Sequence, residues 1–172
     1  MNIVWLCNIE IPLISDILGK QKCIFGGWLD ITSRKLITDN NKLTIIYPSQ
    51  EKQAYSDSSF SFYSFSSNKE LELVVEKHMT LNEVDVIHIW GTEFQYSNFF
   101  VHLLRKKNKI SKVVISIQGL STLCSEHYFE GLPKHIIYRY TLRDFIKHKN
   151  INNCKKIFSR NGKFEVDTLK NV

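Results

Sequence analysis

Short β-rich apolar runs alternate along the chain with segments whose apolar residues recur at helical spacing. Strands are expected at residues 2–7, 43–47, 60–65, 85–90 and 112–117. Helices are expected at residues 28–36, 70–80 and 93–107, where apolar side chains fall on one face. Strands that alternate with helices are typical of an open, mostly parallel sheet with helices on both faces. The sequence therefore predicts an α/β, Rossmann-like fold.

The remaining segments are less regular. Residues 8–24 show no clear periodicity and are expected to form a long loop, and the strand at 60–65 is expected at the edge of the sheet. A second loop is expected to contain Cys124, Glu126 and His127 and to lead into one helix over residues 134–149. A short strand or turn at 156–159, a turn at 161–162 and a last helix at 164–172 complete the chain.

Length and composition limit the class of protein. The 172 residues suffice for one α/β domain, 1–172, and are few for two. The apolar runs are too short and too polar for a membrane span, and the N-terminal run lacks the basic start of a secretory signal. The four cysteines, which form no C-x-x-C pair, are expected to be scattered buried thiols: Cys7, Cys23, Cys124 and Cys154. A cytoplasmic protein without a metal site is expected.

Charge is unevenly distributed. Residues 1–100 hold 8 Lys and Arg against 12 Asp and Glu, a balance of −4, whereas residues 101–172 hold 15 against 5, a balance of +10. A basic half of this kind indicates a polyanionic neighbour, which is an anionic membrane surface, a nucleic acid or an acidic partner domain. No signature of a nucleic-acid-binding fold accompanies the charge, so nucleic acid is not expected as a partner.

Ligands of open α/β sheets bind beyond the carboxyl ends of the strands, where the strand order reverses. Gly26 and Gly27 precede a helix there, and glycines let a phosphate approach the backbone at a helix N-terminus; an ordinary turn is the alternative. The sequence contains neither G-x-G-x-x-G nor G-x-x-x-x-G-K-[ST], which argues against a NAD enzyme and excludes a P-loop.

Two further segments follow strand ends. In the first, Thr92 and Glu93 either cap the next helix or present a carboxylate to the hydroxyls of a ligand, beside Trp90 as an apolar platform for a sugar. In the second, Gln118 and Gly119 precede the Glu126–His127 pair, in which a carboxylate adjoins an imidazole. His88, inside its strand, is expected to be a hydrogen-bonded core histidine.

The basic segment 134–149 interleaves Lys and Arg with aromatic and aliphatic residues. This pattern fits a helix that lies on anionic lipid. It also fits a solvated helix whose apolar side faces the core.

Taken in order, these segments resemble the N-terminal domain of family 4 glycosyltransferases, which have the GT-B architecture of two facing Rossmann-like domains. The resemblance covers nearly the whole chain and rests on NIVWLC (2–7), GGWL (26–29), DVIHIWGTE (85–93) and VVISIQGL (113–120). Residues 131–145 also resemble a bacterial polysaccharide-assembly branch of that family.

The resemblance implies that this half binds the acceptor and that Gly26 and Gly27 face the donor diphosphate. Acceptor contacts are then expected from the strand-end residues, which are Trp90, Gly91, Thr92, Glu93, Gln118, Gly119 and His127. Many members of the family carry a His where this chain has Gln118, and His127 is the nearest residue that could replace it. Most donor contacts in the family come from a C-terminal domain whose motifs are not recognisable here, so the chain is expected to be inactive by itself.

The expected function is that of a retaining glycosyltransferase, which moves a hexosyl unit from a nucleotide sugar to a glycan or lipid-linked acceptor in surface polysaccharide synthesis. No cofactor or metal is expected beside the nucleotide-sugar donor. The expected location is the cytoplasm, with peripheral contact at the inner face of the membrane. The alternative is a Rossmann-like binding module that docks on an anionic membrane surface or an acidic partner without catalysis.

Overall fold

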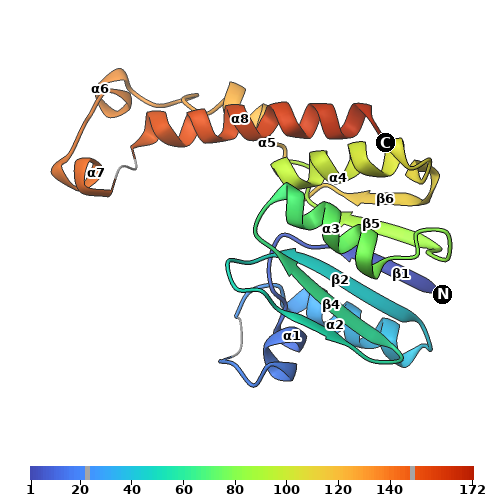
Figure 1. The fold of residues 1–172 in the computed structure, drawn as a ribbon. Helices are drawn as coiled ribbons and strands as arrows, with labels where there is room; N and C mark the ends of the chain where they lie inside the picture. The colour runs from blue at the N-terminus through green and yellow to red at the C-terminus, as the bar shows by residue number, and fades with distance from the viewer. Residues whose placement is uncertain (22–23, 148–149) are drawn as a thin grey trace.

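The computed structural model describes residues 1–21, 24–147 and 150–172, and its centre is a six-stranded sheet in the order β3-β4-β2-β1-β5-β6 (Figure 1). The strands are β1 (Asn2–Leu6), β2 (Lys42–Pro48), β3 (Ala54–Ser56), β4 (Phe60–Phe65), β5 (Val86–Trp90) and β6 (Val113–Ser116). Every neighbouring pair is parallel except β3 and β4. The predicted α/β, Rossmann-like class is therefore confirmed.

Alternate residues of β1 enter two hydrophobic cores, one on each face of the sheet. Val4 and Leu6 belong to the core beneath α3 (Asn68–His78) and α4 (Gln95–Lys106). Ile3 and Trp5 belong to the core beneath α1 (Pro12–Ile17) and α2 (Gly27–Thr38). The near-continuous apolar sequence of β1 follows from this burial on both faces.

The strand order reverses at β1. The chain moves from β1 to β2 and β4 on one side, then returns to place β5 and β6 on the other side of β1. The carboxyl ends of β1 and β5 therefore flank the point at which an open α/β sheet binds ligands.

The structure corrects two expectations in the N-terminal half. The expected loop 8–24 contains α1, which begins at Pro12, a residue suited to the first turn of a helix, and which buries Ile14; Lys22 and Cys23 of that loop lie outside the described residues. The strand at 60–65 is not at the sheet edge, because β4 pairs with β2 on one side and with the exposed strand β3 on the other.

The C-terminal third differs more from expectation. The expected loop after β6 contains α5 (Ser121–Glu126). The single helix expected at 134–149 is interrupted and forms α6 (Lys134–Ile137) and α7 (Leu142–Lys147), and its last residues, His148 and Lys149, lie outside the described part of the chain. The break follows from reciprocal capping at the start of α7: Thr141 Oγ1 accepts from the Asp144 amide at 3.2 Å, while Asp144 accepts from the Thr141 amide at 2.9 Å.

A single helix, α8 (Ile151–Lys170), replaces the short strand, turn and final helix expected after residue 155. Gly162 lies inside this helix because it meets α5 at close range: a Cβ on Gly162 would lie 2.9 Å from Thr122 Cα. One turn further along α8, the buried carboxylate of Glu165 accepts from the Ser121 amide at 2.6 Å and from Thr122 Oγ1 at 2.8 Å. Contacts with a neighbouring helix therefore override the local turn signal.

Candidate functional site

An open hollow lies at the carboxyl ends of β1, β5 and β6, beside the start of α2. Its volume of about 620 Å³ is within the range of small-molecule sites. Residues from all four elements or from the segments that follow them line it, and these include Asn8, Gly26, Trp28, Trp90, Ser116 and Gln118. The hollow therefore occupies the position predicted from the order of the strands.

Aromatic rings in contact with one another form one wall of the hollow. Trp90 meets Trp28 edge-on with ring centroids 4.7 Å apart, and meets Trp5 edge-on at 5.3 Å. The imidazole of His88 stacks on Trp90 at 3.7 Å. Trp28 is 49% exposed and Trp90 is half-buried, so the wall presents indole surface to a ligand.

His88 is held in place by the strand beside it. Its Nε2 shares a hydrogen bond of 2.8 Å with Ser116 Oγ on β6, which confirms the expected hydrogen-bonded histidine. Burial lowers the pKa of His88 to about 4, because desolvation disfavours the charged imidazolium. His88 is therefore neutral at physiological pH and serves as a flat partner for Trp90.

Amide side chains from two strand ends meet at the rim of the hollow. Asn8, which follows β1, donates from Nδ2 to Gln118 Oε1, which follows β6, at 2.9 Å. With Oε1 engaged, the Nε2 group of Gln118 remains as the donor for a ligand. Among the described residues, Asn8 Oδ1 and Trp90 Nε1 are buried without a hydrogen-bond partner.

The glycine pair lies where the hollow meets α2. Gly26 is the N-cap of α2 and has a φ of 75°, in the left-handed region that favours glycine. A Cβ there would lie 2.8 Å from Ile9 Cδ1, whereas a Cβ on Gly27 would have no atom within 4 Å. Within the described part of the chain no side chain caps α2. The first N–H groups of α2 therefore have no side-chain acceptor from this part of the chain at the end of the helix that adjoins the hollow.

Of the segment 90–93, Trp90 lines the hollow and the other three residues do not. The capping interpretation of Thr92 and Glu93 is wrong, since α4 begins at Gln95 with Phe94 as N-cap and without a capping side chain from the described residues. Thr92 and Gly91 are buried, and Gly91 has a φ of 96°. Among described groups, neither Thr92 Oγ1 nor Glu93 Oε2, both buried, has a hydrogen-bond partner.

His127 does not join the hollow. It follows α5 as its C-cap, and its exposed Nδ1 contacts Glu130 Oε2 at 2.7 Å instead of the neighbouring Glu126. Gly119 is exposed on the segment between β6 and α5. The structure thus brings Gly26, Trp90 and Gln118 together.

Residues of the hollow that were not predicted as contacts include Asn8, Trp28 and Ser116. Asn8 lies two residues after β1, in the segment 8–27 that the strand-end rule selects, but it was not named as a ligand contact. Trp28 is the second residue of α2, and Ser116 is the last residue of β6, paired in register with Trp90. Only the pairing of β5 with β6 could have identified Ser116.

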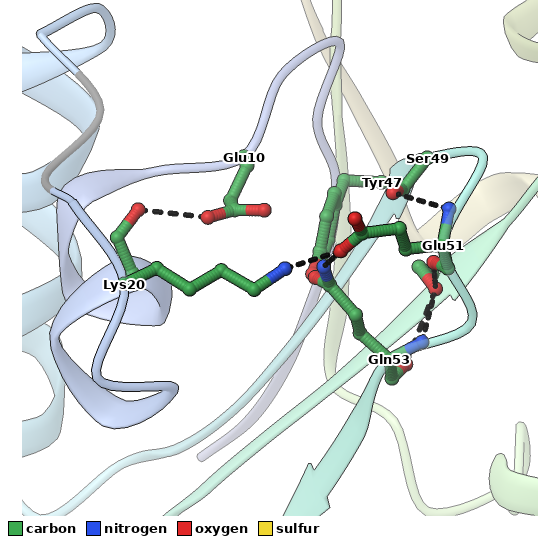
Figure 2. Close-up of polar contacts among 8 residues, drawn as sticks. Glu10, Lys20, Tyr47, Ser49, Glu51 and Gln53 are labelled. Carbon is green, nitrogen blue, oxygen red and sulfur yellow. Dashed lines mark hydrogen bonds and ion pairs between the residues drawn. The ribbon is translucent and has the colours of Figure 1, made fainter.

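A second polar cluster fixes the segment after β1 to the turn after β2 (Figure 2). Lys20 Nζ donates to Glu51 Oε2, which also accepts from Gln53 Nε2 at 3.1 Å, while the buried Tyr47 hydroxyl donates to Gln53 Oε1. Glu10 accepts from Ser15 Oγ at 2.7 Å. The bond between Lys20 and Glu51 therefore joins the segment after α1 to the turn after β2, and the Glu10–Ser15 bond lies within the segment after β1.

The described residues contain no group of three or more His, Cys, Asp or Glu side chains placed to hold a metal ion. Cys7 is buried, Cys154 is half-buried and Cys124 is exposed. The expectation of buried thiols is therefore right for Cys7 and wrong for Cys124, and Cys23 is outside the described residues.

Comparisons with protein-family models, with curated proteins and with solved structures find no match to this chain.

Proposed function

We propose that the chain is the acceptor-binding N-terminal part of a retaining glycosyltransferase, which transfers a hexosyl unit from a nucleotide sugar to a glycan or lipid-linked acceptor in surface polysaccharide synthesis. The observation that carries the proposal is the composition of the hollow at the strand reversal. Trp28 and Trp90 offer an apolar wall, and the Asn8–Gln118 pair offers amide groups at its rim. A sugar ring has an apolar face and a hydroxyl edge, which match these two surfaces.

The hollow is suited to positioning a substrate. His88 is a weak base, since burial holds its pKa at about 4, and its Nε2 is engaged with Ser116. Gln118 stands where many family members have a His, and an amide can orient a hydroxyl but cannot exchange its proton at neutral pH. Retaining transfer in the family is thought to need no enzymatic nucleophile, so orientation of the acceptor and stabilisation of the leaving diphosphate would supply the rate.

The start of α2 is the proposed contact for the donor diphosphate. Gly27 leaves open space where a side chain would be, and the uncapped N–H groups with the helix dipole favour an anion. A second, donor-binding domain would supply the remaining contacts, and closure of the two domains would exclude water.

Of the three tryptophans of the chain, Trp28 and Trp90 line the hollow and the buried Trp5 contacts Trp90, so tryptophan emission is a probe of this site. Titration with soluble oligosaccharides and with UDP-glucose or GDP-mannose should change the emission. Gln118→Ala should weaken the response to oligosaccharide about fivefold or more, the equivalent of one lost hydrogen bond. Exposed Gln50→Ala is the matched control and should leave the response unchanged.

Two results would contradict the proposal. An emission that no carbohydrate changes would remove the sugar site. Turnover of a nucleotide sugar by residues 1–172 alone would show that the chain needs no donor-binding domain.

A further inference from the structure

Residues 131–160, here called the arm, comprise α6, α7 and the first half of α8. Figure 1 shows α6 and α7 beyond the edge of the sheet, joined to the fold through α8. The side chain of Asn152 on α8 donates to the Ile137 carbonyl at 3.1 Å, which ties α6 to α8. At the root of the arm, Tyr128 packs on Phe158 with ring centroids 5.4 Å apart. The described parts of the arm, residues 131–147 and 150–160, are therefore tied to one another and to the fold.

Large apolar side chains of the arm are exposed. The exposed fraction is 77% for Tyr138, 76% for Leu142, 67% for Ile146 and 60% for Phe145. Leu132, Ile136, Tyr140 and Ile157 are exposed as well. The interpretation of this segment as a helix with its apolar side in the core is therefore wrong. Apolar residues gathered in this number on one extension mark an interaction surface.

The same arm is strongly basic. Its sequence holds 8 Lys and Arg and one acid, Asp144, a net charge of +7. Asp144 is engaged at the start of α7, where hydrogen bonds from Thr141 lower the pKa of its carboxyl. On α7 itself, Arg143 and Lys147 alternate with Leu142, Phe145 and Ile146. Cationic and apolar groups are therefore presented together.

The combination of exposed apolar side chains with Lys and Arg indicates which kind of polyanion the arm binds. Nucleic acid and acidic proteins attract Lys and Arg, but neither requires exposed Leu and Ile beside them. An anionic bilayer uses both: headgroups attract the cations, and aromatic and aliphatic side chains enter the interfacial region. Among the described residues no helix is long and apolar enough to cross a membrane.

We propose that the arm docks the protein on an anionic lipid bilayer, with Tyr138, Leu142 and Ile146 in the interface and Arg139, Arg143 and Lys147 at the headgroups. This inference is independent of the proposed sugar site, since no residue of the arm lines the hollow as the structure describes it.

The test is co-sedimentation of the 172-residue chain with two kinds of vesicle: phosphatidylcholine alone, and phosphatidylcholine with about 30 mol% phosphatidylglycerol. We expect binding to the anionic vesicles only, weakened by salt because screening shortens the reach of the charges. The triple variant Arg139→Glu, Arg143→Glu and Lys147→Glu should bind about 100-fold more weakly, given the contribution of each cation near the surface. The triple variant Tyr138→Ser, Leu142→Ser and Ile146→Ser should lose about tenfold or more.

Matched controls lie on the sheet half. Lys35→Glu, Lys42→Glu and Lys69→Glu change the net charge equally at exposed positions. Ile24→Ser, Ile31→Ser and Leu73→Ser remove exposed apolar groups outside the arm. Each control should change the affinity less than about threefold, and circular dichroism with thermal melting verifies that all variants are folded.

Three outcomes would overturn the proposal. The first is equal binding to neutral vesicles or no binding to anionic ones. The second is a loss in the sheet controls as large as in the arm variants. The third is competition by soluble polyaspartate with no effect of the apolar arm variant, which would assign the surface to an acidic protein.

Discussion

The sheet half of the molecule and its C-terminal third are built differently. In the sheet half, Trp5 and Leu6 are buried between helices on two faces, and the sequence balance is acidic. In the C-terminal third, α8 buries Gly162, Glu165 and Thr168 while large apolar side chains of the arm face solvent. The first region is stabilised by apolar burial and the second by close polar contacts between helices. Their substitutions should therefore have different costs.

The largest effect should come from truncating the same residue type in each region. Leu6 is fully buried and Leu142 is 76% exposed. Leu6→Ala should lower the free energy of unfolding by about 2–5 kcal/mol, because it removes transfer energy and leaves a cavity. Leu142→Ala should change it by no more than about 0.5 kcal/mol. Urea unfolding of the two variants measures both, and equal costs would show that the arm is packed on the fold.

The second effect concerns the joint between α5 and α8. Removing the Glu165 carboxylate leaves the buried Ser121 amide without its acceptor, so Glu165→Ala should cost about 1–3 kcal/mol. Exposed Glu126→Ala on α5 is the matched control and should be nearly neutral.

Hydrogen exchange locates the effect of Glu165→Ala. The amides of Ser121 and Thr122 should exchange faster in this variant while those of β1 stay protected, because the joint opens without loss of the sheet. Unchanged exchange at Ser121 would mean that α5 is held by something other than Glu165.

The same division explains what could be predicted from the sequence. The sheet and its covering helices were predictable because apolar residues form short continuous runs in buried strands and recur every three to four residues in helices. Strand β3 was missed because all three of its residues are exposed, which leaves no apolar pattern. The interruption between α6 and α7 had a local signal, the T-x-x-D capping pattern at Thr141 and Asp144, that was overlooked. Helix α8 has a local start signal in its N-cap Asn150, but the Asn161–Gly162 pair has the pattern of a turn, and the close approach of Thr122 to Gly162 has no signal in the sequence.

The candidate site was predictable to a similar degree. Convergence of Gly26, Trp90 and Gln118 followed from the rule that strand ends meet at one edge of a parallel sheet. The rule applies only to residues that follow a strand closely. His127 was grouped with them because α5, which separates it from the end of β6, was not predicted. The burial of Thr92 depends on how α4 packs and has no local signal.

The smallest effect should be a pH dependence of the contact between α4 and α8. Asp167 accepts hydrogen bonds from His102 at 2.8 Å and from Asn98 at 2.7 Å, and these contacts, led by that with His102, lower the pKa of its carboxyl. A carboxyl whose pKa is lower in the folded state stabilises that state above its unfolded pKa, near 3.9, and the contribution is lost as the pH falls through the lowered value. The side chains of His102 and Asp167 are each about half exposed, so screening by solvent keeps their contribution to stability small.

Comparison of the parent chain with Asp167→Asn isolates this contribution, because every other carboxyl titrates in both. The difference in the free energy of unfolding should shrink as the pH falls below about 5, where the Asp167 carboxyl takes up its proton. Urea unfolding at closely spaced pH values measures it, with Asp39→Asn as a control at an exposed carboxyl that ends α2. Parallel curves for Asp167→Asn and the parent at low pH would show that Asp167 keeps an ordinary pKa, and the contact between α4 and α8 would then rest on other bonds, such as that from Arg105 to Asn171 Oδ1 at 2.8 Å.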